Sequence, residues 1–273
     1  MSDLTILSQS LSVVLVEPLN DINIGSVVRA CKNFGVSSIR LVNPARANPA
    51  QILVSAPRAE DLIDRIERYT SLDEALSDCT MALGMTARQR RNKRLYLEPR
   101  GAAADLIAIA REQASLDEPR RVALVFGRED SGLSNEDLDR CNALVTIPTN
   151  PDYSSLNLAQ AVLLMLWETF RAGTDAPIQR LPEHIASPQS DSPLASHEEL
   201  ERMTNHAERV LARVGFLKES SHKHMMSTIQ EMFKRAGLDQ REVAIWHGIF
   251  SQTSWALDNP ERLADIAANT EEG

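Results

Sequence analysis

The sequence predicts a parallel α/β domain followed by a small all-α domain. Up to about residue 172, short apolar runs alternate with amphipathic segments, and this alternation is typical of a parallel sheet covered by helices on both faces. A stretch rich in proline and small polar residues then breaks the pattern, and beyond it apolar residues recur only at helical spacing. We therefore expect an α/β domain over residues 1–172, a linker over 173–198 and a helical domain over 199–273.

Five apolar runs are the expected strands of the sheet. They are short and rich in valine and isoleucine, and they end at proline, asparagine or glycine, which is the pattern of a buried parallel strand. The runs are 13–16, 39–42, 81–83, 122–126 and 144–147. The expected helices of this domain are 25–34, 72–78, 102–114, 135–140 and 156–170.

The expected helical domain contains three segments with apolar residues at helical spacing. The second segment ends before Gly237, a good helix stop, and Asp239 with Glu242 resembles a capping box that opens the third. We expect the methionine, aromatic and aliphatic stripes of these segments to form its core. The stripes are Leu200, Met203, Ala207, Val210, Leu211 and Val214; Met226, Ile229, Met232 and Phe233; and Val243, Trp246, Ile249 and Phe250.

The composition limits the compartment and the partners. The longest apolar stretch near the middle of the chain has seven residues, whereas about 18 are needed to span a membrane. The first ten residues lack the basic start of a secretory signal, and the three cysteines lack CxxC spacing, so we expect a protein of the reducing cytoplasm with no membrane partner. The net charge of −9 argues against a nucleic-acid partner.

One segment reverses that charge locally. Residues 88–100 contain six basic side chains and one acidic side chain, a net charge of +5. The basic residues are Arg88, Arg90, Arg91, Lys93, Arg94 and Arg100. Such a segment is either a solvated surface loop or a surface that binds a polyanion.

Several common chemistries are disfavoured. All six histidines lie after residue 183, so a Ser-His-Asp nucleophile in the α/β domain would need a base from the helical domain. His222 and His224 suggest a metal site only weakly, because no cysteine or close carboxylate accompanies them. Gly127 and Gly132 have the spacing of a phosphate loop, but Leu133 stands where the essential lysine belongs. No GxGxxG follows the first strand.

Polar residues instead gather after three of the expected strands. They form the segments 23–30, 126–133 and 147–158. Asn23 can cap a helix on which Arg29 lies nearly two turns further on, and the glycines after residue 126 indicate a tight loop whose backbone approaches a ligand. Taken singly, these segments are a helix cap, a turn and a second helix cap. Because open α/β sheets build their sites at strand ends, the three together predict a site.

The three segments resemble a known family. The strings NIGSVVRA, FGREDSGL and IPTNPDYSSLNLAQAV are similar to the three ordered motifs of the SPOUT-class RNA 2′-O-methyltransferases. The subgroup that the chain most resembles is the bacterial tRNA methyltransferase acting on the 2′-hydroxyl of nucleotide 32, cytidine or uridine, in the anticodon loop. The resemblance covers residues 10–172, and the subgroup also has a proline-rich linker and a C-terminal helical extension.

The resemblance implies a fold, a cofactor and partners. It implies a sheet whose C-terminal part forms a trefoil knot, a rare exception to unknotted topology, which binds S-adenosylmethionine. It also implies a homodimer whose active site forms across the two subunits and whose substrate is tRNA, bound through the helical extension. The chemistry requires no metal.

The resemblance also implies the residues of the site. Arg29 would be the catalytic arginine, with Ser155 and Asn157 placing it and the substrate. The implied cofactor contacts are Met85, Thr86, Ala87, Gly127, Glu129, Ile147, Ser154, Ser155 and Leu156. The family usually has a small polar residue at the position of Met85, so a backbone contact is expected there. We also expect RNA contacts at Asn23, Arg88, Arg90, Arg91, Lys93 and Arg94.

Two questions stay open at the level of sequence. Arg29 either accepts the proton of the ribose hydroxyl, as the family proposal has it, or orients the hydroxyl and its phosphate while the proton leaves elsewhere, since a guanidinium seldom deprotonates. The alternatives to the function are methylation of another tRNA or rRNA ribose and a non-catalytic RNA-binding protein of the same fold.

Overall fold

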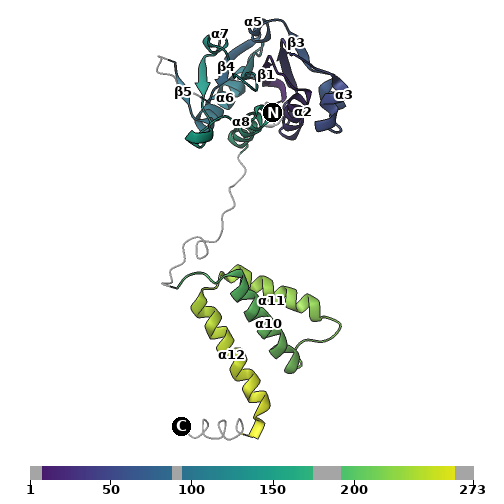
Figure 1. Ribbon diagram of the computed structural model, residues 1–273, viewed down its shortest axis with the longest axis vertical. Helices are drawn as coiled ribbons and strands as arrows, with labels where there is room; N and C mark the ends of the chain where they lie inside the picture. Colours follow the sequence, from purple (N-terminus) through teal and green to yellow (C-terminus); the bar gives the residue numbers. More distant parts are fainter. Residues whose placement is uncertain (1–7, 88–93, 175–191, 262–273) are drawn as a thin grey trace. The chain divides into compact units, whose positions relative to one another are not determined.

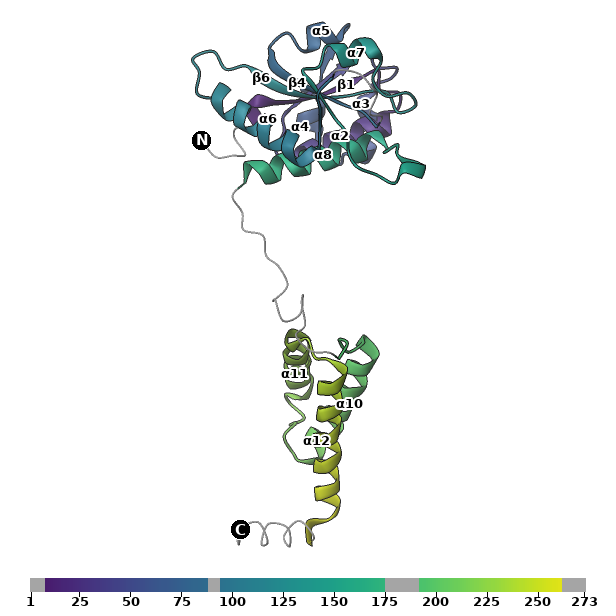
Figure 2. The same ribbon diagram turned by 90° about the vertical axis from the view of Figure 1, so that its left-hand side faces the viewer.

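The computed structural model describes residues 8–87, 94–174 and 192–261. The chain divides into two compact units, 1–177 and 178–273, and each is described here by itself. Figures 1 and 2 show the first unit as a sheet with helices on both faces and the second as a group of helices. No helix in the described ranges is long and apolar enough to cross a membrane, and the same ranges hold no cluster of three metal-ligating side chains.

A sheet of seven strands forms the centre of the first unit. The strands are β1 (Leu11–Val16), β2 (Ser38–Val42), β3 (Glu67–Tyr69), β4 (Cys79–Met85), β5 (Tyr96–Leu97), β6 (Arg121–Phe126) and β7 (Ala143–Val145). Their order is β3-β2-β1-β6-β4-β7-β5, and every pair of neighbours is parallel. The parallel α/β prediction is confirmed.

The helices cover the two faces unequally. The main helices of one face are α2 (Asp21–Asn33), α6 (Pro99–Gln113) and α8 (Leu158–Gly173), which pack on alternate residues of β1 such as Val13 and Leu15. The opposite face packs Val14 and Val16 against the short helices α5 (Leu72–Ala75) and α7 (Asn135–Asp139). Figure 1 shows α2 and α8 on one side of the sheet and α5 and α7 on the other. Every residue of β1 is buried because both faces are covered.

The sequence patterns predicted the longer strands and helices of this unit, but some of the predicted ends were wrong. The helix expected at 25–34 begins four residues earlier, because Asn20 and not Asn23 is its N-cap: the Asn20 side chain accepts the N–H of Ile22. The helix expected at 156–170 begins at Leu158, capped by Asn157. Four short elements were not predicted: β3, β5, α3 (Pro49–Ser55) and α4 (Glu60–Ile63). A single-turn 3-10 helix, Pro151–Tyr153, precedes α8.

The second unit is the expected helical one. Its helices are α10 (His197–Arg213), α11 (His222–Ala236) and α12 (Gln240–Asp258). Gly237 ends α11 in the left-handed conformation, with φ 63°, and the capping box of Asp239 and Glu242 opens α12 as expected. The core packs Met203, Ala207, Val210, Leu238, Val243 and Phe250. Residues 175–191 of the expected linker lie outside the described residues.

The core prediction was wrong for three side chains of this unit. Val214, Met232 and Ile249 are 44%, 54% and 48% exposed. In the described part of this unit, α10, α11 and α12 each contribute a narrow buried stripe, and α11 buries Met226 alone. The apolar stripes of the sequence are therefore wider than the contacts that these helices make with one another.

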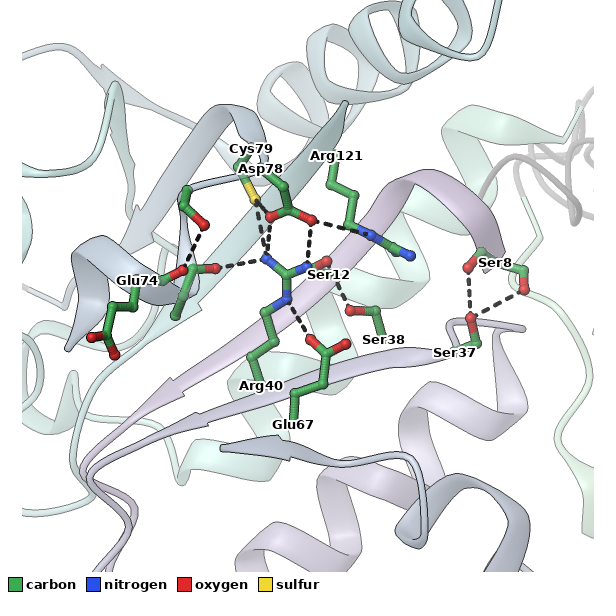
Figure 3. A network of polar contacts seen from close by, with 12 residues as sticks. Ser8, Ser12, Ser37, Ser38, Arg40, Glu67, Glu74, Asp78, Cys79 and Arg121 are labelled. Atoms are coloured by element: carbon green, nitrogen blue, oxygen red, sulfur yellow. Dashed lines mark hydrogen bonds and ion pairs between the residues drawn. The ribbon is translucent and has the colours of Figure 1, made fainter. Parts of the chain in front are cut away.

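A buried arginine organises the end of the sheet where β4 and β6 begin. Arg40 of β2 is 3% exposed, and its guanidinium donates to the two carboxylate oxygens of Asp78 at 2.5 and 2.7 Å and to Glu67 at 3.0 Å. Figure 3 shows Arg121 approaching the same Asp78 carboxylate from β6, at 3.6 Å. Burial by itself would lower the pKa of Arg40, but Asp78 raises it above its ordinary value, so this arginine stays charged.

Candidate active site

Four segments that are far apart in the sequence meet at the carboxyl ends of the strands. The strands β1, β6, β4 and β7 are consecutive neighbours, and all run in the same direction. Their carboxyl ends therefore lie side by side, which is where open α/β sheets place ligands. The residues that follow these four strands include all three polar segments singled out in the sequence.

One cavity is lined by all nine residues expected to bind the cofactor. These are Met85, Thr86, Ala87, Gly127, Glu129, Ile147, Ser154, Ser155 and Leu156. The rest of the lining includes Arg128, Asp130 and Ser131, which the sequence reasoning left out although it singled out their segment. Met85, Ile147 and Leu156 give the cavity an apolar part, and the loop after β6 gives it a polar part.

Close backbone packing shapes the loop after β6. A Cβ atom added to Gly127 would lie 2.2 Å from the carbonyl carbon of Gly132 and from the nitrogen of Leu133. Gly132 has a φ of 73°, and its N–H donates to the carbonyl of Arg128 at 3.0 Å. The loop thus folds back on itself, and only glycine fits at the first position. On the neighbouring strand, the N–H of Thr86 donates to the carbonyl of Val145 at 3.0 Å, which joins the ends of β4 and β7.

A chain of hydrogen bonds joins the three polar segments. Glu129 accepts the N–H of Leu19 at 2.9 Å and that of Asn20 at 3.2 Å, just before α2. It also accepts the side-chain amide of Asn23 at 2.9 Å, and the oxygen of that amide accepts Nδ2 of Asn157 at 3.1 Å. The side-chain oxygen Oδ1 of Asn157 in turn accepts the N–H of Ala159 and caps α8. Side chains 134 residues apart are thereby held in one network.

Asn23 has a different structural role from the one expected. It lies inside the first turn of α2 and does not cap it. Both ends of its amide bind protein groups, Glu129 and Asn157. The sequence signal for this role was that Asn23, Glu129 and Asn157 lie in three ordered motifs. Which of these residues bind one another can be seen only in the folded chain.

Of the expected catalytic residues Arg29 and Ser155, only Ser155 lines the cavity. Ser155 is exposed and lines the cavity, whereas Arg29 is exposed on α2 and is not among the lining residues. Ile22, 42% exposed, lies seven residues before Arg29 and thus on the same face of α2. On α8, the neighbour of α2, Leu163 and Trp167 are 43% and 48% exposed. The expected catalytic arginine thus lies on a partly apolar outer surface.

The expected RNA contacts 88–93, including Arg88, Arg90, Arg91 and Lys93, lie outside the described residues. Arg94 is described, and it forms an ion pair with Asp139 of α7 and donates to the carbonyl of Asn135 at 3.3 Å. These contacts attach Arg94 of the basic segment to α7, the helix that follows the cavity loop.

In the cavity loop, the guanidinium of Arg128 is followed in sequence by the carboxylates of Glu129 and Asp130. Arg128 contacts the carboxylate of Asp130 through Nε and Nη2, at 3.0 Å each, and that of Glu17 through Nη1 at 3.2 Å. The hydrogen bonds from Arg128, together with one from Ser131, lower the pKa of Asp130 to about 2. The carboxylate of Asp130 is therefore ionised at neutral pH.

This fold and this strand-end site define a methyltransferase: the chain belongs to the SpoU rRNA Methylase family, which it matches over residues 10–167. The helical unit matches, over residues 198–262, the C-terminal domain of the tRNA methyltransferase TrmJ. Within the family, the chain is therefore similar to TrmJ in both of its units.

Relatives of this kind match nearly the whole chain. The tRNA (cytidine/uridine-2′-O-)-methyltransferase TrmJ of Pectobacterium atrosepticum is 38% identical, over 91% of this chain and 98% of the relative. The tRNA (cytidine/uridine/adenosine-2′-O-)-methyltransferase TrmJ of Pseudomonas aeruginosa is 35% identical, over 88% and 92%. The crystal structure of TrmJ from Z. mobilis is 28% identical, with a TM-score of 0.54 and coverage of 88% and 97%.

Proposed function

We propose that this chain transfers the methyl group of S-adenosylmethionine to the 2′-hydroxyl of nucleotide 32, cytidine or uridine, in the anticodon loop of tRNA. The observation that carries the proposal is the single cavity lined by all nine expected cofactor residues. Relatives that match both units and are named for methylation of tRNA ribose support the choice of substrate.

The residues of the cavity fit this cofactor. The apolar side chains of Met85, Ile147 and Leu156 suit an adenine ring, and the carboxylates of Glu129 and Asp130 suit the positive charge of a sulfonium. The absence of a side chain at Gly127 leaves backbone groups open to a ligand. When bound, the sulfonium supplies an activated methyl group, so the protein's part is to orient the reactants.

Three residues carry that orientation in the proposal. Asn157, held by Asn23 and by the start of α8, fixes the segment of Ser155 at the mouth of the cavity. Ser155 holds the ribose of the target nucleotide there. Arg29 binds the 2′-hydroxyl and the adjacent phosphate, since a guanidinium seldom loses its proton and stays a hydrogen-bond donor.

The position of Arg29 supports a homodimer. The side chain lies on an outer surface beside Ile22, and the cavity lining does not include it. We propose that the exposed apolar side chains of α2 and α8 pair two copies in the C₂ arrangement that is commonest among soluble oligomers, so that the active site is completed across the interface. Sedimentation at micromolar concentration should give about twice the mass of 30.3 kDa; a single-chain mass at that concentration contradicts the dimer.

Substrate RNA is held, in this proposal, by two separate surfaces. The basic segment 88–100 binds the phosphate backbone near the cavity, and the helical unit binds a second part of the tRNA. The protein works in the cytoplasm, whose reducing conditions suit its three free cysteines.

The first test of this proposal is the Arg29→Ala variant. Methyl transfer to tRNA should fall by a factor of 100 or more, while the calorimetric affinity for S-adenosylmethionine stays within twofold, because Arg29 does not line the cavity. Lys32→Ala, on the same helix, is the matched control and should retain activity. An Arg29→Ala enzyme with activity within threefold of wild type would remove Arg29 from the catalytic machinery.

A further inference from the structure

The connection between β1 and α2 begins with a residue in an unusual backbone conformation. Glu17, directly after β1, has a φ of 50°, which residues other than glycine seldom adopt. Its N–H donates to the carbonyl of Val42 at 2.8 Å, and its carboxylate accepts Nη1 of Arg128 at 3.2 Å. A non-glycine residue persists in this conformation only where its surroundings fix it, and such places cluster at functional sites.

The contact between Glu17 and Arg128 follows from the register of the sheet. Leu15 of β1 pairs with Phe126 of β6, so Glu17 and Arg128 are each two residues beyond that pair. Glu129, the next residue, accepts the N–H groups of Leu19 and Asn20. Two adjacent residues of the cavity loop thus hold the β1–α2 connection at two points.

Arginine is the residue type that this arrangement needs. One edge of the Arg128 guanidinium, Nε and Nη2, faces Asp130, while Nη1 reaches Glu17. A planar guanidinium can serve two carboxylates in fixed directions, which the single ammonium group of lysine does less well. Without this cation, the carboxylates of Glu17, Glu129 and Asp130 would repel one another across the two loops.

The two members of the ion pair differ in their relation to the cavity. Arg128 lines it, but Glu17 does not. Glu17 precedes α2 by four residues, and α2 carries Arg29. A change at Glu17 therefore tests the position of α2 without altering a group that lines the cavity.

We propose that Glu17 and Arg128 are positioning residues for methyl transfer: their ion pair holds the start of α2, and with it Arg29, in place relative to the cofactor cavity. The inference rests on the proposed function, because it takes Arg29 as the residue that acts on the ribose. It assigns to Arg128 a second task besides lining the cavity.

The test compares cofactor binding with turnover in the full-length enzyme. Glu17→Gln keeps the size of the side chain and removes its charge, so S-adenosylmethionine affinity should stay within about twofold of wild type while kcat on tRNA falls tenfold or more. The matched control is Asp73→Asn, which removes the carboxylate from the ion pair with Arg140, at 2.8 Å, between α5 and the end of α7. Both arginines are 37% exposed, and we expect the control to keep the wild-type affinity and kcat.

A double-mutant cycle shows whether Glu17 acts through Arg128. Arg128→Gln should lower kcat, and adding Glu17→Gln to it should lower kcat by less than twofold more. An unchanged kcat in Glu17→Gln, or fully additive effects in the cycle, would overturn the inference. So would equal losses of affinity, kcat and Tm in Glu17→Gln, because they would show a purely structural role.

The same assays separate this inference from the proposed function. Wild-type enzyme that binds no S-adenosylmethionine or leaves tRNA unmethylated contradicts the proposed function, and the inference falls with it. Active wild type with an equally active Glu17→Gln variant contradicts the inference alone.

Discussion

Single side chains divide between those that stabilise the sheet and those that serve the cavity. Arg40 and Asp78 belong to the first group, because their contacts join β2 to the start of β4, at the end of the sheet remote from the cavity. Because Arg40 is buried, removing the carboxylate of Asp78 would leave a buried charge without this partner. That loss is the costly change at such a site. The side chain of Asp78 is 48% exposed, so water moderates the effect.

Asp78→Asn should therefore destabilise the first unit by about 2 kcal/mol at pH 7, the scale of hydrogen bonds to a charged group. The hydrogen bond from Arg40 lowers the pKa of Asp78, so its contribution is present above the ordinary aspartate pKa and is lost as the pH falls through the lowered value. Urea unfolding at pH 7 and at pH 3 should show a smaller acid loss in the variant than in wild type. The exposed Asp64→Asn is the control, and equal acid losses in Asp78→Asn and wild type would contradict the account.

Asn23 and Glu17 show what sequence reasoning could and could not supply at this scale. The resemblance to the family was enough to predict nine of the residues that line the cavity. They did not predict that Asn23 binds Glu129, 106 residues away, because an asparagine at the start of a helix is normally a cap. The pair of Glu17 and Arg128 was also missed, because each residue taken alone is an ordinary charged residue in a turn.

Among the strands, a continuous apolar run decided which could be predicted. The buried strands β1 and β6 have six residues each and a clear apolar run. β3 has three residues, charged or half-exposed, and β5 has two, so neither carries a recognisable pattern. Both lie at edges of the sheet, where the pairing partner and not the local sequence determines the strand.

The cavity loop after β6 has little room for substitution at Gly127. Gly127→Ala would place a methyl group 2.2 Å from backbone atoms of Gly132 and Leu133, so the loop must open. We expect the affinity for S-adenosylmethionine to fall tenfold or more in calorimetry. Gly101→Ala is the matched control, because nothing lies within 4 Å of the added atom and alanine favours α6. Wild-type affinity in Gly127→Ala would show that the loop does not form the cofactor site.

At the scale of the whole molecule, the proposed function assigns the cofactor to the first unit and contacts with tRNA to both units. Every residue of the cavity lies before position 162, in the unit that has its own sheet and core. Two linked contacts with one tRNA reinforce each other through effective concentration.

A fragment of residues 1–177 should therefore bind S-adenosylmethionine with wild-type affinity but bind tRNA at least tenfold more weakly than the full chain. Filter binding at several salt concentrations, beside calorimetry with the cofactor, measures both quantities. Undiminished tRNA affinity in the fragment would mean that the helical unit takes no part in binding RNA.

The most direct measurement of the proposed function uses tRNA transcripts that differ at one atom. Full-length protein is incubated with radioactive S-adenosylmethionine and a tRNA transcript. Each transcript has cytidine, uridine or adenosine at nucleotide 32, and each is tested with a ribose and with a 2′-deoxyribose at that nucleotide. We predict methylation of the cytidine and uridine transcripts and background incorporation into every 2′-deoxy transcript. Equal incorporation with and without the 2′-hydroxyl of nucleotide 32 would contradict the account, because the methyl group would then go to another position.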